Sequence, residues 1–237
     1  MGGNRAAKDE LFDALASVAR ALGVGRRAEI VDVLCQGERS VEELAGQIGQ
    51  SVANTSHHLQ SLAGAGLVAR RRSGTRVFYR LASPLVEQVW DSLRQLAAEQ
   101  VAHFDAIARG YLGDRDDVPM VTCAQLLDRM RSGAVVLDVR PQTEYLAGHI
   151  PGALSTPPQW LDEAVDDFLA SVPDGDVVAY CRGELCVFAD DAVRVLRAAG
   201  RDAARLQDGF PQWRRAGLPV TTGISPGVLA ASSYPEP

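Results

Sequence analysis

The stretch with the strongest chemical signal is VVAYCRGELCV, residues 177–187. Four apolar or aromatic residues run into Cys181, a glycine follows two places later, and helical periodicity begins near Val187. This pattern predicts a buried strand, a tight loop and a helix N-terminus. Such a loop directs backbone N–H groups into its hollow, and the helix dipole adds partial positive charge there. A thiol at the first loop position should ionise below the pKa of about 8.5 of a free cysteine, so Cys181 is a candidate nucleophile.

Packing is the competing interpretation, because cysteine is among the most frequently buried residue types. The surrounding segments favour chemistry. LDVRPQTEYLAGHIPGA (residues 137–153) precedes AYCRG, and LQDGFPQW (206–213) and AGLPV (216–220) follow it. Together these four motifs resemble the rhodanese family of sulfurtransferases over residues 121–222. The resemblance implies an α/β domain at residues 121–223, with a central parallel sheet and no cofactor.

The resemblance also implies a reaction, in which the Cys181 thiolate takes sulfane sulfur from thiosulfate or a related donor and passes it to a thiol or cyanide acceptor. Arg182 can attract an anionic donor or simply be solvated. Asp138, Arg140 and His149 are expected to frame the site through structural hydrogen bonds. The substrate-binding loop is expected to comprise Arg182, Gly183, Glu184, Leu185, Cys186 and Val187.

Two further features of the loop bear on its chemistry. Cysteine phosphatases need an arginine six places after the nucleophile, and this position holds Val187, which disfavours phosphatase or arsenate reductase activity. Cys186 is a possible redox partner that forms a disulfide with an oxidised Cys181, or it packs inward where the helix begins. Cys123 has no identifiable partner.

Length and composition allow two ordinary domains, since 237 residues with 46% hydrophobic and 23% charged residues suit a globular protein. Apolar runs stay well short of the ~20 residues of a membrane span, and the N-terminus lacks the apolar core of a signal peptide. Four cysteines are too few for a disulfide scaffold. We therefore expect a cytoplasmic protein without a membrane partner.

The net charge of −6 is unevenly distributed. Residues 1–112 hold 13 Lys and Arg against 12 Asp and Glu, a net of +1, whereas residues 113–237 hold 11 against 18, a net of −7. Within the first half, RRRSGTR (residues 70–76) is a positive run without an acid. It is either a solvated surface loop or a nucleic-acid contact.

The first half reads as four helices followed by a β-hairpin. Helical periodicity covers residues 8–22, 27–35, 41–48 and 51–66, with Ser40 and Ser51 as caps, and residues 67–81 alternate about a turn at Ser73 and Gly74. Two short helices with small polar residues on the second predict a helix-turn-helix, and the basic hairpin beside it predicts a wing. Residues 11–112 resemble the ArsR family of winged-helix repressors, although some winged helices serve only protein interaction.

The fold class is thus a mainly α winged helix-turn-helix domain, residues 1–112, followed by the α/β domain. Its expected partner is a double-stranded DNA operator. His57 should face DNA while His58 packs inward. The residues expected to contact DNA are Ser51, Asn54, Thr55, Ser56, His57, Gln60, Arg70, Arg71, Arg72 and Arg76.

One long helix is expected after Ser83 and Pro84, because apolar residues recur at helical spacing up to Tyr111. One winged-helix core cannot bury so long a stripe, so we expect a homodimer, which matches two half-sites about 34 Å apart. No metal site is expected: the third helix lacks a cysteine, and Asp91 and His103 stand alone at the relevant spacing. Cys35 is expected to pack in the core.

Residues 113–120 are expected to form a linker and residues 224–237 a mobile tail. Three hypotheses remain open: a DNA-binding regulator whose rhodanese domain senses sulfur or redox state, a sulfurtransferase without regulatory coupling, and a regulator with a catalytically silent rhodanese module.

Overall fold

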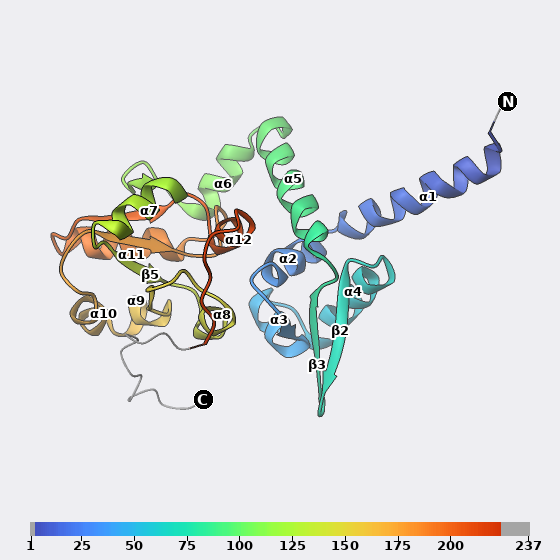
Figure 1. Cartoon of the computed structure of the whole chain (residues 1–237). Coiled ribbons are helices and arrows are strands. Elements are labelled where there is room, and N and C mark those ends of the chain that lie inside the picture. Colours follow the sequence, from blue (N-terminus) through green and yellow to red (C-terminus); the bar gives the residue numbers. More distant parts are fainter. Residues whose placement is uncertain (1–2, 224–237) are drawn as a thin grey trace. The chain divides into compact units, whose positions relative to one another are not determined.

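The computed structural model describes residues 3–223 and divides into two compact units, one up to Phe104 and one from Asp105 onward (Figure 1). The first unit contains α1 (Arg5–Leu22), α2 (Gly25–Leu34), β1 (Arg39–Ser40), α3 (Val41–Gln47), α4 (Val52–Gly64), β2 (Val68–Ser73), β3 (Arg76–Leu81) and α5 (Pro84–Gln100). Its three strands form an antiparallel sheet in the order β1-β3-β2.

The helix-turn-helix pair, α3 and α4, begins at the two serines that the sequence marks as caps. The Ser40 side chain accepts a bond from the Glu43 N–H while Glu43 bonds back to the Ser40 N–H, which completes a capping box. Ser51 accepts a bond from the Asn54 N–H at 3.2 Å. Both helices contribute to the core of the first unit, which includes Cys35 as predicted.

The predicted wing is present as the hairpin β2–β3. Ser73 pairs with Arg76, so the two turn residues are Gly74 and Thr75, one place later than the alternation predicted. Gly74 has a φ of 59°, a left-handed conformation that glycine adopts without steric cost.

The single long helix predicted after Ser83 is wrong, because the chain forms two helices, α5 and α6 (Phe104–Leu112). Val101 is extended and His103 has a φ of 64°, so the helix cannot continue through this point. The non-helical residues between α5 and α6 are about as many as one helical turn contains. The spacing of the apolar residues is therefore nearly unchanged, and the sequence pattern does not reveal the break. Ser83 occupies the N-cap position of α5, but its side chain makes no capping bond.

The second unit is an α/β domain, and the predicted fold class is confirmed. A five-stranded sheet has the order β4-β8-β7-β5-β6, with every pair parallel. Its strands are β4 (Met120–Val121), β5 (Val135–Asp138), β6 (Leu154–Ser155), β7 (Val177–Tyr180) and β8 (Ala203–Leu206). Its helices after α6 are α7 (Cys123–Arg131), α8 (Gln142–Ala147), α9 (Gln159–Glu163), α10 (Val165–Ser171), α11 (Phe188–Ala198) and α12 (Phe210–Arg215).

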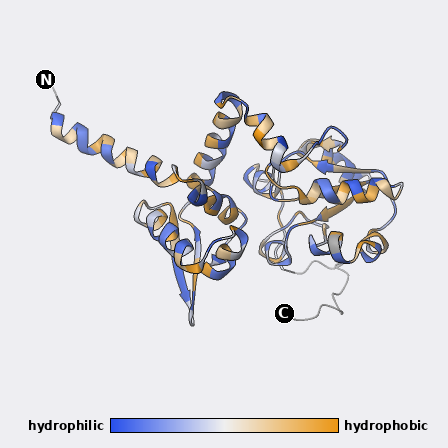
Figure 2. Ribbon diagram, turned by 180° about the vertical axis from the view of Figure 1, so that it is seen from behind, coloured by the Kyte–Doolittle hydropathy of each residue, from blue (hydrophilic) through white to orange (hydrophobic). Residues whose placement is uncertain are grey.

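Two apolar cores cover the two faces of this sheet. Val177 and Ala179 of β7 pack in the core that includes α11, whereas Val178 and Tyr180 pack in the core that includes α7, α8 and α12. Alternate residues of a strand point to opposite faces, so a strand buried on both faces is continuously apolar. The helix α11 packs on one of these two faces, and hydrophobic and hydrophilic segments alternate along it, as expected for a helix with one buried side (Figure 2).

The segment between α6 and β4, predicted as a linker, packs onto the second unit. Val118 is buried in the core that includes α11, and Arg194 of α11 bonds to the Asp114 carbonyl and pairs with Asp117. The division between the units falls after Phe104, the first residue of α6, whereas the predicted first domain extends to residue 112. The predicted mobile tail, 224–237, lies outside the described residues.

No helix in the part of the chain that the structure describes is both long and apolar enough to span a membrane.

Candidate functional site

Cys181 follows β7 directly, at the carboxyl end of a central strand of the parallel sheet, where ligands of such sheets bind. The loop from Cys181 to Val187 then leads into α11 as predicted. Within the loop, the Cys186 N–H donates to the Gly183 carbonyl at 3.1 Å. This N–H is therefore engaged within the loop backbone and does not stabilise the Cys181 sulfur.

A second sulfur shares the loop with Cys181. Both thiols are buried, with 4% exposure at Cys181 and 8% at Cys186, and the Cys186 thiol donates a hydrogen bond to the Cys181 sulfur. Backbone N–H groups are divided between them: Gly183 and Ala189 bond to Cys181, and Arg182 and Phe188 bond to Cys186. When protonated, the Cys181 thiol itself donates to the Gly183 carbonyl at 3.8 Å and to the Cys186 carbonyl at 3.7 Å. The loop thus holds two sulfurs that share one set of hydrogen-bonding groups.

The pKa values of the two thiols move in opposite directions. Burial raises the pKa of Cys181, but the bonds from Cys186, Gly183 and Ala189 together outweigh burial and bring this pKa below its ordinary value. The hydrogen bond to Cys181 and then burial raise the pKa of Cys186 well above its ordinary value. The first proton of the pair is therefore expected to leave Cys181, which keeps it as the candidate nucleophile.

The N-terminal end of α12 packs against the Cys181 loop. The Phe210 N–H donates to the Cys181 carbonyl at 3.1 Å. A Cβ added to Gly209 would lie 2.3 Å from the Gly183 nitrogen, so only glycine fits at position 209. Gly183 itself has a φ of 133°, which favours glycine there too. The LQDGFPQW motif therefore supports the back of the loop.

Arg182 points to Glu144 of α8. Its Nε lies 3.0 Å from Oε1 and 3.1 Å from Oε2 of this carboxylate, and Nη2 also bonds to Oε1. The Glu144 side chain is fully buried, while that of Arg182 is 19% exposed. The Arg182 guanidinium is thus mostly shielded from solvent, and Glu144 compensates its positive charge.

The predicted structural residues form a buried network next to β7. Arg140 donates from Nε to Asp138 Oδ1 at 2.9 Å and from Nη2 to the Gly148 carbonyl at 2.7 Å. The Tyr180 hydroxyl donates to Asp138 and accepts from the Ile150 N–H. Burial and then the Asp138 charge raise the pKa of this hydroxyl well above its ordinary value. This network fixes the end of β7 immediately before Cys181.

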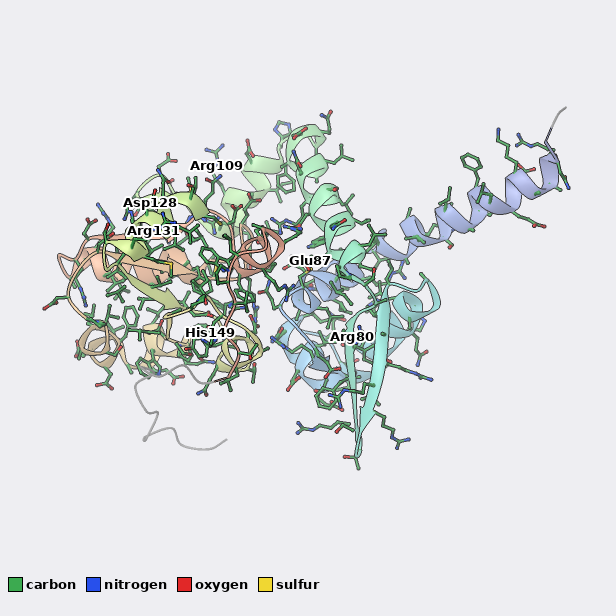
Figure 3. The ribbon with its side chains drawn as sticks, in the orientation of Figure 1. Arg80, Glu87, Arg109, Asp128, Arg131 and His149 are labelled. Atoms are coloured by element: carbon green, nitrogen blue, oxygen red, sulfur yellow. The ribbon has the colours of Figure 1, made fainter. Side chains whose placement is uncertain are left out.

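His149 lies inside the second unit (Figure 3). Its ring stacks on Tyr145 with the centroids 3.7 Å apart, and its Nδ1 is 2.8 Å from the Tyr145 carbonyl. Its backbone pairs with that of Thr221, which holds the last described segment against the stretch that follows α8. This geometry supports the predicted structural role of His149.

In the first unit, most of the residues predicted to contact DNA are accessible on α4 and on the hairpin. Thr55 is the exception: it is fully buried, and its hydroxyl donates to the Ser51 carbonyl at 3.0 Å, so its predicted contact with DNA is wrong. A β-branched residue on the inner face of a helix packs against the core. Ser56 is half-buried, and Ser51, Asn54, His57, Gln60, Arg70, Arg71, Arg72 and Arg76 are exposed.

The hairpin arginines that are predicted to contact DNA differ in their partners. Arg71 pairs with Glu38, with Nε 3.2 Å from Oε1, and its guanidinium lies 5.0 Å from the centre of the Phe78 ring. Arg72 donates to the Gly74 carbonyl at the turn, at 3.3 Å. His58 is half-buried next to exposed His57, in line with the predicted division of roles.

Comparison with known proteins agrees with both halves of the chain. Residues 25–70 match the bacterial regulatory proteins of the arsR family, and residues 122–216 match the rhodanese-like domain. The HTH-type transcriptional regulator Rv0324 of Mycobacterium tuberculosis is 45% identical over 228 residues, which cover 96% of this chain and 99% of the relative. This chain belongs to the arsR family. It is a regulatory protein of this family that carries a rhodanese-like domain.

Other relatives of this arsR-family chain match its first half. The HTH-type transcriptional regulator KmtR of M. tuberculosis is 38% identical over 81 residues, 34% of this chain and 62% of the relative. The solution structure of the homodimeric winged helix-turn-helix DNA-binding domain (fragment 1–100) of Mb0332 from Mycobacterium bovis is 41% identical, covers 44% of this chain and 95% of that chain, and superposes with a TM-score of 0.40.

Sequence reasoning missed a charged cluster in this arsR-family chain, formed by Arg115, Asp190 and Arg205. Asp190 on α11 is fully buried between the two guanidinium groups, with Arg205 Nε 3.0 Å from its Oδ1. Burial raises the pKa of Asp190, and the two arginines oppose this shift. An aspartate on the apolar face of a helix is the sequence signal that could have indicated this cluster. The sequence alone could not identify its partners, because Arg115 and Arg205 come from distant segments.

Proposed function

We propose that this arsR-family protein is a DNA-binding transcriptional regulator whose rhodanese-like domain takes sulfane sulfur from thiosulfate or a persulfide onto Cys181. The observation that carries the sulfur chemistry is the loop between β7 and α11, where Cys181 receives hydrogen bonds from the Cys186 thiol and from two backbone N–H groups. The exposed polar face of α4 and the arginines of the hairpin support DNA binding.

In the proposed first step, the Cys181 thiolate attacks the outer sulfur of thiosulfate. A Cys181–sulfur bond forms, the sulfur–sulfur bond of thiosulfate breaks, and sulfite leaves with the electron pair. The N–H groups of Gly183 and Ala189 stabilise the thiolate before attack. A thiol or cyanide acceptor then attacks the outer sulfur of the persulfide, and Cys181 leaves as the thiolate.

On the DNA side, arginines of the hairpin would contact phosphates while the exposed residues of α4 reach base edges in the major groove. A homodimer is proposed because apolar side chains line the exposed surfaces of α1 and α5. Leu11, Phe12 and Leu15 on α1 are 58–60% exposed, and Leu85 and Leu96 on α5 are 63% and 56% exposed. A DNA-bound regulator with four free cysteines would work in the cytoplasm.

The proposal is tested with the full chain and its Cys181→Ser variant. Thiocyanate formed from thiosulfate and cyanide measures sulfur transfer, and DNA affinity with and without a sulfane donor measures coupling. We expect thiocyanate from the wild type alone and a donor effect on DNA affinity that Cys181→Ser abolishes. Transfer without a donor effect would favour an enzyme that lacks regulatory coupling, and no transfer would favour a silent rhodanese module.

A redox switch is the second candidate, and the hydrogen bond between the two thiols favours it. A sulfenic acid on Cys181, formed by peroxide, would react with the Cys186 thiol to give a disulfide and water. Mass spectrometry after peroxide treatment tests this candidate, since the disulfide lowers the mass of the loop peptide by two hydrogens. Overoxidised Cys181 with an unmodified Cys186 thiol would rule it out.

A further inference from the structure

Arg115 makes three contacts that join the Cys181 loop to the segment between α6 and β4. Its Nη1 donates to the Glu184 carbonyl at 2.7 Å, and its Nη2 donates to the Cys186 carbonyl at 2.7 Å. The same Nη2 lies 2.6 Å from Asp190 Oδ2. One guanidinium therefore holds two carbonyl groups of the loop and the first turn of α11 together.

The contact with the Cys186 carbonyl bears directly on the sulfur. This oxygen accepts a hydrogen bond from the Cys181 thiol at 3.7 Å, and its partial negative charge favours the neutral thiol over an anionic sulfur. Because Arg115 binds the same oxygen, its positive charge offsets that effect. The bond to Glu184 holds the carbonyl two residues earlier, so Arg115 limits the rotation of the loop peptides.

The cluster behind the loop is also positively charged overall. Arg115 and Arg205 flank Asp190, so two positive charges face one negative charge below α11. The charge of Cys181 in turn influences the pKa of Arg205, which burial lowers overall. The charged and titratable groups near Cys181 are Cys186 and Arg182 of the loop, Glu184 at its outer side, Asp190 of α11, Arg205 of β8 and Arg115.

We propose that Arg115 is a positioning residue that holds the Cys181 loop in the conformation that stabilises an anionic sulfur, both as thiolate and as persulfide. The proposal rests on the proposed function for its biological meaning, but the state of the sulfur can be measured independently. Arg115 does not touch the donor or the transferred atom. It acts through the loop carbonyls and through Asp190.

The test measures thiolate absorbance in the ultraviolet against pH in the full chain, with the Cys181→Ser counterpart of each variant subtracted. Arg115→Ala should shift the first ionisation of the thiol pair upward, so that the thiolate fraction at pH values below this ionisation falls about tenfold for a shift of about one pH unit. Arg115→Lys keeps the charge but not the forked donors, so a smaller fall is expected. Arg194→Ala is the matched control, because Arg194 binds the same segment through Asp114 and Asp117.

Arg115→Ala removes one of the two guanidinium partners of the buried Asp190 carboxylate and can destabilise the fold, so Arg115→Ala with Asp190→Asn is compared with Asp190→Asn alone. The same upward shift is expected there. An unshifted ionisation in Arg115→Ala or in the double variant, or an equal shift in Arg194→Ala, overturns the positioning role. Thiocyanate production separates this result from the proposed function. A wild type that transfers no sulfur removes the proposed function alone, and an active wild type with no Arg115 effect removes the positioning role alone.

Discussion

Arg182 and Glu144 form an ion pair in which both carboxylate oxygens meet the same guanidinium group, at 3.0 and 3.1 Å from Nε. The pair joins the Cys181 loop to α8. Burial opposes the charge of Arg182, but the bond and charge of Glu144 outweigh it and raise the pKa of the guanidinium. Arg182 therefore holds the loop in place, and its charge is shared with a buried carboxylate.

This pair leads to a prediction about stability. Arg182→Ala would leave the buried Glu144 carboxylate without its partner, and we expect the free energy of unfolding to fall by about 3 kcal/mol. Glu144→Gln in the same chain removes the orphaned charge and should restore more than half of that loss. Urea denaturation of the two single variants and the double variant gives the coupling between them. Additive losses would show that the pair contributes nothing.

The hydrogen bond from Cys186 to Cys181 predicts how sulfur transfer depends on pH. Cys186→Ala removes the donor that lowers the pKa of Cys181, so this pKa should rise by about one to two units, given ~1.5–3 kcal/mol for a hydrogen bond to a charged group. The pH profile of the rate then moves to higher pH. The loss is largest below the pKa of Cys181, where a rise in this pKa removes most of the thiolate, and it disappears at alkaline pH.

Cys186→Ser provides the matched control for this experiment. A serine hydroxyl still donates a hydrogen bond to the Cys181 thiolate, so its profile should stay close to that of the wild type. Equal shifts in the serine and alanine variants would show that the sulfur of Cys186 matters for a reason other than this bond.

The wing predicts a graded response to salt. Arg70 and Arg76 are exposed, so replacing either with alanine should reduce the slope of log K against log salt concentration by about 1. The same replacement should weaken the binding of all DNA sequences to a similar extent. Arg71 already pairs with Glu38, so Arg71→Ala should reduce the slope less. Fluorescence anisotropy with labelled DNA at several salt concentrations measures these slopes. An equal decrease at all three positions would mean that DNA displaces Glu38 from Arg71.

The apolar surface of α1 predicts a dimer. Hydrophobic segments recur along this helix, which projects from the rest of the first unit (Figures 1 and 2), and Leu15 is 60% exposed. Leu15→Asp places a charge where a second copy would pack, so we expect dissociation in sedimentation experiments and weaker binding to two half-sites. Leu146→Asp changes an exposed leucine of α8 and serves as the control. A Leu15→Asp variant that sediments like the wild type would exclude α1 from the interface.

The limits of periodicity are visible at particular residues. The apolar stripe from Leu85 to Tyr111 continues across the break at His103, because three non-helical residues replace roughly one turn. Thr55 lies among polar residues in the sequence, yet it faces the core, since its position on the helix depends on where α4 packs. Local patterns report spacing and cannot report which neighbour covers a side chain.

By itself, the sequence determined the two fold classes, the capped helices of the first unit, the wing and the position of Cys181 before a helix. These depend on local signals, such as a serine three residues before a glutamate or an apolar run that ends in Cys-Arg-Gly. The tertiary structure alone decided that Arg182 meets Glu144, that Gly209 lies against Gly183 and that Arg115 reaches the carbonyls of the loop. These partners are 38, 26 and 69 residues apart or more in the chain, and folding brings them together through the order of the strands in the sheet.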